Sequence, residues 1–346
     1  MKKLILIIIL IFVTATPVQA ADLTAPTAPD SAQELMPVDT ESFGEGLWYV
    51  FKSAIRTIQP EIAKGAGLCM AVIAAMMLTS MLNSFPGMTK HVTELSGTIA
   101  VASLLISSAN TMIQAATATV TELSEYGKLF LPVMTAAMAA QGGVTGSAAI
   151  YTGTAVFDAV LCSLISAVLV PTIYIFIALA TANSALGEDL LKKIRDFIKW
   201  LVSWCLKTIL YVFTAYISIT GVVSGTADQT ALKATKLTIS GMVPVVGGIL
   251  SDASEAVLVS AGVVKSAVGV YGLLAIISIV IGPFLRIGVQ YLLLKLTAAV
   301  CGVFGSKKTT ELIQDFSAAM GLLLAMTGTV CLLLLISTVC FLKGVS

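Results

Sequence analysis

Residues 236–284 read KLTISGMVPVVGGILSDASEAVLVSAGVVKSAVGVYGLLAIISIVIGPF. The stretch begins polar, is interrupted at Pro244 and at the pair Gly247–Gly248, and then enters a long apolar run that is interrupted again at Gly282–Pro283. Small residues let membrane helices pack closely. Broken helices are tolerated in a bilayer when they lie against protein or line a cavity. The stretch therefore predicts a helical membrane protein with interrupted segments.

The prolines of this stretch have counterparts earlier in the chain. Pro132 precedes Pro244 by the same number of residues by which Pro171 precedes Pro283. The sequence IRDF at 194–197 is echoed by IQDF at 313–316, although at a slightly larger separation, and the Gly-Gly pairs do not share the common separation. We interpret the pattern as an internal duplication, with copy one at 129–222 and copy two at 223–346. The alternative is chance similarity between apolar sequences.

Composition defines the broad class of the protein. Of the 346 residues, 57% are hydrophobic and 11% are charged, with a mean hydropathy of +0.98, whereas soluble domains carry roughly 25% charged residues. Several apolar runs exceed the ~18 residues that indicate a membrane span. The net charge of +1 and the lack of a basic patch with interleaved aromatics give no support to nucleic-acid binding. The six cysteines form no CxxC pair and are interpreted as small buried hydrophobes.

The N-terminus has the pattern of an export signal. Lys2 and Lys3 precede an apolar run, and Val18-Gln19-Ala20 resembles a small-residue cleavage site, so residues 1–20 are predicted to be a secretory signal peptide. The alternative is an uncleaved anchor. In either case the mature N-terminus lies outside the cytoplasm. Residues 21–60 are then predicted to be an extended exported tail followed by an amphipathic helix at 46–59. This helix lies either on the outer membrane surface or on the protein's own outer face.

Six spans account for the remaining apolar runs. An N-terminal helical pair lies within 61–128, and each copy supplies two further spans. The predicted spans are 66–82, 96–119, 149–182, 200–222, 266–298 and 316–342. The links at 187–199 and 306–308 are the most basic and are expected in the cytoplasm. The short pieces near 132 and 239–250 then re-enter from outside without crossing. In a rival topology both pieces cross the membrane, the repeats are inverted as in many transporters, and one basic link lies outside.

The predicted fold is therefore an all-α polytopic membrane protein with about six transmembrane helices and two Pro/Gly-broken re-entrant segments. Its single histidine, His91, and the absence of P-loop, HExxH and dinucleotide motifs predict no enzyme, no cofactor and no metal. Charged residues inside spans are functional candidates, and Arg286 is expected to line a polar path, or to pair with Asp158 or a freed carbonyl. The candidates for a path or a packing face are Arg286, Asp158, Pro244, Gly247, Gly248, Pro283, Pro132 and Pro171.

One region also resembles a known family. Pro244-Val245-Val246-Gly247-Gly248, Leu250–Ala253, Val264–Gly269 and Gly272–Leu274 are similar to stage III sporulation protein AE of endospore-forming bacteria, and the resemblance extends over roughly 60–342. It implies a membrane component of the mother-cell membrane around the forespore, within a channel or feeding tube. The implied partners are other proteins of the same operon, including an ATPase and ring-forming subunits, and a forespore-membrane protein. The family offers no catalytic residues.

Two functions of different classes follow. The first is a permease-like or scaffold subunit of a trans-envelope channel, surrounded by membrane lipid and able to form homo-oligomers. The alternative is a self-sufficient secondary transporter of a small solute, held where the broken helices meet. An intramembrane hydrolase using Asp158 and His91 is a more distant third reading.

Overall fold

The computed structural model describes residues 26–37, 42–85, 90–140, 144–186, 189–219, 267–304 and 306–344. Within these residues there is no β-strand, and six helices are long and apolar enough to cross a membrane. The long helices are α3 (Phe43–Leu82), α4 (Lys90–Ala140), α5 (Val144–Leu164), α6 (Val170–Leu186), α7 (Asp189–Ile219), α10 (Ala267–Phe304) and α11 (Lys307–Gly344). A π-helical turn, η1 (Ile165–Leu169), joins α5 to α6, and the two count as one span. The predicted all-α fold with six spans is confirmed.

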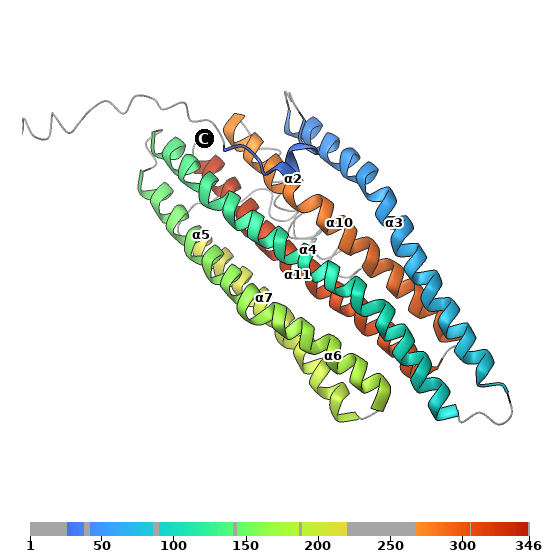
Figure 1. The fold of residues 1–346 in the computed structure, drawn as a ribbon. Helices are drawn as coiled ribbons and strands as arrows, with labels where there is room; N and C mark the ends of the chain where they lie inside the picture. The colour runs from blue at the N-terminus through green and yellow to red at the C-terminus, as the bar shows by residue number, and fades with distance from the viewer. Residues whose placement is uncertain are drawn as a thin grey trace, which may run out of the picture.

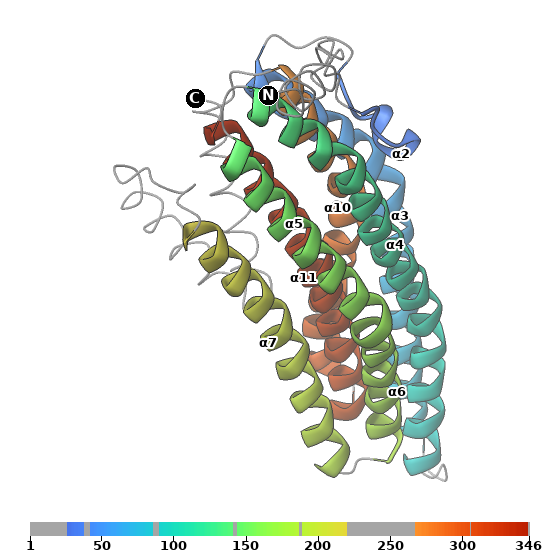
Figure 2. The same cartoon turned by 90° about the vertical axis from the view of Figure 1, so that its left-hand side faces the viewer.

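The helices run up and down, so that the two basic links lie at one end of the bundle. The ends of α3, α6 and α10 and the starts of α4, α7 and α11 gather at the lower right of Figure 1 and at the bottom of Figure 2. The start of α7 carries exposed Lys192 and Lys193, and the start of α11 carries Lys307 and Lys308. This arrangement agrees with the parallel topology rather than with the inverted one. We refer to it as the basic end, which the positive-inside rule predicts to be cytoplasmic.

The last helix, α11, forms the core of the bundle. It packs against α10, α4, α6, α5 and α7, and 94% of its most apolar window is buried. A helix that is apolar on every side is expected to be surrounded by protein or lipid, and here it is surrounded by protein. Side chains such as Leu323, Met326 and Leu333 are fully buried. Within the described helices, the axis of the bundle is therefore filled.

Of the four prolines singled out in the sequence, the three in the described residues lie within helices. Pro132 lies inside α4, which continues to Ala140, so the re-entrant segment predicted near residue 132 is wrong. Pro283 lies inside α10. Pro171 is the second residue of α6, directly after η1. A proline removes one helical hydrogen bond and crowds the preceding turn, and a wider π turn accommodates such a disturbance.

The structure describes only part of the proposed duplication. The second predicted re-entrant segment, with Pro244, Gly247 and Gly248, lies outside the described residues, as do the predicted signal peptide and everything up to residue 25. The internal duplication itself remains a prediction.

The predicted amphipathic helix is the first half of α3 and not a separate surface element. Val50, Ala54 and Ile58 are buried at helical spacing, in a helix that packs on α10 and α4. The second of the two sequence interpretations, packing on the protein's own outer face, is therefore the one observed. The preceding segment is not an extended tail either. Its short helix α2 (Asp30–Gln33) contacts α10, and the Ala28 N–H donates a hydrogen bond of 3.2 Å to the Tyr271 hydroxyl.

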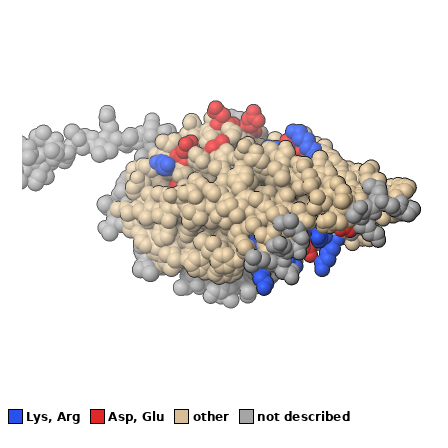
Figure 3. Space-filling model, turned by 60° about the horizontal axis from the view of Figure 1, so that its bottom comes forward, with Lys and Arg blue, Asp and Glu red and all other residues tan. Residues whose placement is uncertain are grey.

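The outer surface is mostly uncharged, as a bilayer requires. The broad middle of the face shown in Figure 3 carries no charged side chain. Large apolar side chains are exposed on the parts of α3 and α10 nearest the basic end, among them Met77, Leu78, Leu292 and Leu296. These faces are suited to contact lipid tails.

Candidate functional site

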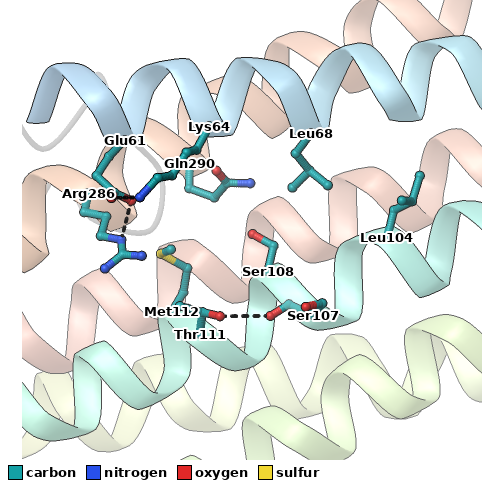
Figure 4. A pocket seen from close by; sticks show the side chains of 11 residues that line it. Glu61, Lys64, Leu68, Leu104, Ser107, Ser108, Thr111, Met112, Arg286 and Gln290 are labelled. Carbon is teal, nitrogen blue, oxygen red and sulfur yellow. Dashed lines mark hydrogen bonds and ion pairs between the residues drawn. The ribbon is translucent and has the colours of Figure 1, made fainter.

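A polar pocket lies in the side of the bundle, between α3, α4 and α10. Its volume is about 250 Å³, far above the roughly 30 Å³ that one water molecule occupies in the liquid. Its lining residues come from all three helices and are shown in Figure 4: Glu61, Lys64, Gly65, Leu68, Leu104, Ser107, Ser108, Thr111, Met112, Arg286 and Gln290. We call it the α3–α4–α10 pocket.

A glycine brings two of the three walls close together. A Cβ atom added at Gly65 would lie 2.7 Å from Leu293 Cδ1 and 3.0 Å from Gln290 Oε1. A larger residue here would have to displace the ends of the Leu293 and Gln290 side chains, so glycine favours this close approach of α3 to α10. The close contact places Glu61, one turn before Gly65, opposite Arg286, one turn before Gln290.

The charges of the pocket form a three-membered cluster. Arg286 Nε lies 2.9 Å from Glu61 Oε2. Lys64 Nζ donates a hydrogen bond of 2.9 Å to Glu61 Oε1. Two cations therefore share one carboxylate, which leaves one excess positive charge. The sequence prediction that Arg286 lines a polar site is consistent with this position, but the pairing of Arg286 with Asp158 is wrong.

Two donors of the pocket lack an acceptor. Gln290 is only 5% exposed, and its Nε2 has no hydrogen-bond partner among the described residues. The Nε–H of Arg286 is also without a hydrogen bond, although Glu61 Oε2 is near enough for an ion pair. The contact between Arg286 and Glu61 is therefore an ion pair without a well-directed hydrogen bond. Buried donors are normally satisfied, so both atoms distinguish this pocket from ordinary packing.

The third wall of the pocket meets a polar face of α4 at Ser107. Ser103, Ser107, Asn110, Gln114 and Thr121 are all exposed on this helix, and we call them the α4 polar face. Gln114 and Thr121 of this face also line a groove of about 510 Å³ between α4 and α6, together with Tyr174. The Tyr174 hydroxyl donates a hydrogen bond of 2.8 Å to Asn110 Oδ1.

Asp158 belongs to a different part of the bundle. It is buried on α5, where the Ser124 hydroxyl donates a hydrogen bond of 2.7 Å to its Oδ2 and the Cys162 thiol lies 3.8 Å from its Oδ1. This carboxylate links α5 to α4 and does not line the pocket. His91 lies at the basic end beside Lys308, roughly 50 Å along α4 from Ser124 at 1.5 Å per residue. The structure thus separates the two residues that an intramembrane hydrolase would need together.

Contacts at the basic end were missed by sequence reasoning. The buried guanidinium of Arg195 on α7 donates a hydrogen bond to Asp315 Oδ2 on α11. Nearby, the hydroxyls of Thr98 and Thr309 lie 3.0 Å apart, and Ser184 Oγ donates to the Lys308 carbonyl at 2.8 Å. Arg195 and Asp315 belong to the IRDF and IQDF motifs. The motifs were read as copies of each other, and nothing in their spacing indicates that they meet.

The described residues contain no group of His, Cys, Asp and Glu that could hold a metal ion. Chemically, the pocket offers charge, hydrogen-bond donors and space. These features suit binding of a polar solute or of a polar group from a partner.

Comparisons with known proteins give the family of the chain. No solved structure matches it. A relative from Bacillus subtilis (strain 168), stage III sporulation protein AE, is 21% identical over 234 residues, which cover 68% of this chain and 59% of the relative. The family model for stage III sporulation protein AE matches residues 32–343, almost the whole described bundle. The chain therefore belongs to the stage III sporulation protein AE family and is a multi-pass membrane protein of sporulation.

Proposed function

We propose that this protein is a permease-like or scaffold subunit of a trans-envelope channel between mother cell and forespore, and that it acts by assembling with other proteins. Membership of a sporulation family supports the process. The proposed location is the mother-cell membrane around the forespore, with the mature N-terminus outside the cytoplasm. The proposed partners are an ATPase, ring-forming subunits and a forespore-membrane protein.

The α4 polar face is the observation that carries assembly. Side chains such as Asn110 and Gln114 are exposed on a helix that is long and apolar enough to cross the membrane. Polar side chains at membrane depth seek protein partners or water. The exposed faces of α3 and α10 near the basic end carry Met and Leu instead. The contrast supports lipid on one side of the bundle and protein or water on the other.

The filled axis of the bundle supports the same proposal. Because α11 occupies the centre of the described helices, a path through the axis of one copy has no room. A path along α4, between this subunit and its neighbours, requires no opening of the core. The subunit then contributes one wall of a channel that only the assembly completes.

Photo-crosslinking in sporulating cells tests the proposal. A photoreactive amino acid is placed at Gln114 or Thr121 in a host that lacks its own copy, with Leu292 and Leu296 as matched positions on the apolar face. We expect adducts with copies of this chain or with the proposed sporulation partners from α4, and adducts with lipid from α10. If the α4 positions yield only lipid adducts while the cells still sporulate, assembly through this face is refuted.

The secondary transporter remains the second candidate, because the α3–α4–α10 pocket is large enough for a small solute. Reconstitution of the purified chain alone in liposomes separates the two functions. A transporter moves a solute without partners, whereas a channel subunit requires them.

A further inference from the structure

We propose that the α3–α4–α10 pocket is a binding site for an anion, a phosphate or carboxylate group held by Arg286, Gln290 and Lys64. This inference goes beyond the assembly role and does not depend on it. A chain that assembles with no partner would still bind the anion.

The charge of the pocket favours an anion. Arg286 and Lys64 both contact the single carboxylate of Glu61, at 2.9 Å each. One positive charge is therefore left without a counter-charge among the lining residues. The Arg286 side chain is 35% exposed and that of Lys64 is 73% exposed, so Arg286, the cation farther from bulk water, attracts an anion more strongly.

The donors of the pocket favour an oxygen-rich ligand. Gln290 Nε2 is buried and has no acceptor among the described residues, and Arg286 Nε–H likewise lacks a hydrogen bond. Figure 4 shows both side chains along the pocket, one turn apart on α10. A guanidinium presents several donors in one plane and recognises carboxylate and phosphate oxygens with two parallel hydrogen bonds. An anion would thus satisfy the open donor of Gln290 and share the Arg286 guanidinium with Glu61.

The shape of the pocket sets the size of the ligand. A volume of about 250 Å³ accommodates a phosphate or a small carboxylate. Ser107, Ser108 and Thr111 form the opposite wall on α4, and Leu68 and Leu104 close one side. The Thr111 hydroxyl already donates to the Ser107 carbonyl at 3.1 Å. The binding group is therefore held mainly from the α10 side. It comes either from a soluble anion or from the head group of an anionic lipid, because both present the same oxygens.

Ligand-dependent thermal unfolding of the purified full chain tests the site. A ligand that binds only the folded protein raises its unfolding midpoint. The soluble probe is inorganic phosphate, compared with chloride at equal ionic strength to correct for screening. The lipid probe is phosphatidylglycerol in the detergent micelles, compared with phosphatidylcholine. We expect at least one probe to raise the midpoint, and which one does so identifies the source of the anion.

Two substitutions with opposite signs make the test specific. Arg286→Gln removes a charge-assisted hydrogen bond and weakens binding about 10-fold or more. Glu61→Gln removes the competing carboxylate and tightens binding by about threefold or more. The tightening cannot arise from a misfolded variant. Arg56→Gln is the matched control, because Arg56 lies on α3 like Glu61 but does not line the pocket. This variant should leave binding of the anion within about twofold. The proposal is overturned if neither probe stabilises the protein, or if the stabilisation is unchanged in both pocket variants.

Discussion

The ion pair between Arg195 and Asp315 provides a sharp test of how the bundle is held together. We predict that Asp315→Ala lowers the free energy of unfolding by about 3–5 kcal/mol, because it leaves the buried guanidinium of Arg195 with only the exposed and more distant carboxylate of Asp196. The side chain of Arg195 is 5% exposed and that of Asp315 is 14% exposed, so water cannot replace the lost partner. Asp196 is the matched control. Its side chain is 64% exposed and lies 3.9 Å from Arg195 Nε, and Asp196→Ala should cost at most about 1 kcal/mol.

The double variant Arg195→Met/Asp315→Leu completes the test. Replacing a buried pair by apolar residues of similar volume is often neutral or stabilising, so the double variant should be more stable than Asp315→Ala. The assay is equilibrium unfolding of the purified full chain in mixed micelles of a mild detergent and SDS. The reasoning is refuted if Asp315→Ala costs no more than Asp196→Ala. It is also refuted if the effects of Arg195→Met and Asp315→Leu, each measured alone, simply add in the double variant.

Two further predictions concern packing and topology. Gly272→Ala should destabilise the protein by about 1–3 kcal/mol, because its new methyl group would overlap the ring of Phe130. Gly288→Ala is the control: it has open space around the new atom and should be neutral or stabilising by up to about 1 kcal/mol. Equal effects of the two substitutions in the same unfolding assay would contradict this packing. In a cysteine-free background, Leu190→Cys and Lys308→Cys should both be protected from a membrane-impermeant thiol reagent added to intact cells, because both lie at the basic end; labelling of one alone would contradict the parallel topology.

The number and type of the helices could be predicted because they depend on long apolar runs. Those runs exceed what a soluble chain carries, and each forms a helix that is long and apolar enough to span a membrane. The ends of the helices could not be predicted equally well. Pro132 marked a break in the sequence, yet α4 continues through it. A proline removes only one backbone hydrogen bond of the helix. The packing of α4 against α11 compensates for the loss of that single bond.

The candidate site was predictable only in part. Arg286 could be identified because it is a charge within an apolar run, whereas Glu61 could not be identified as its partner. Glu61 lies between the predicted amphipathic helix at 46–59 and the first predicted span at 66–82, and its distance to Arg286 depends on the close packing of α3 on α10 at Gly65. A sequence pattern indicates which face of a helix is buried, but it does not indicate which other helix packs against that face. The one available signal was the pair Glu61 and Lys64, one turn apart and just before the first predicted span.

Two helical hairpins, α5–α6 with α7 and α10 with α11, bear on the choice between a channel subunit and an autonomous transporter. The α5–α6 segment and α10 both run towards the basic end, and α7 and α11 both return from it. An inverted repeat, the common basis of alternating access, requires opposite directions. The two hairpins also differ in burial, since the apolar window of α7 is 28% buried and that of α11 is 94% buried. Whether or not they share an origin, they are not equivalent halves that exchange environments. A fixed core around α11 with a polar side along α4 is the architecture expected of a subunit that builds a path with its neighbours.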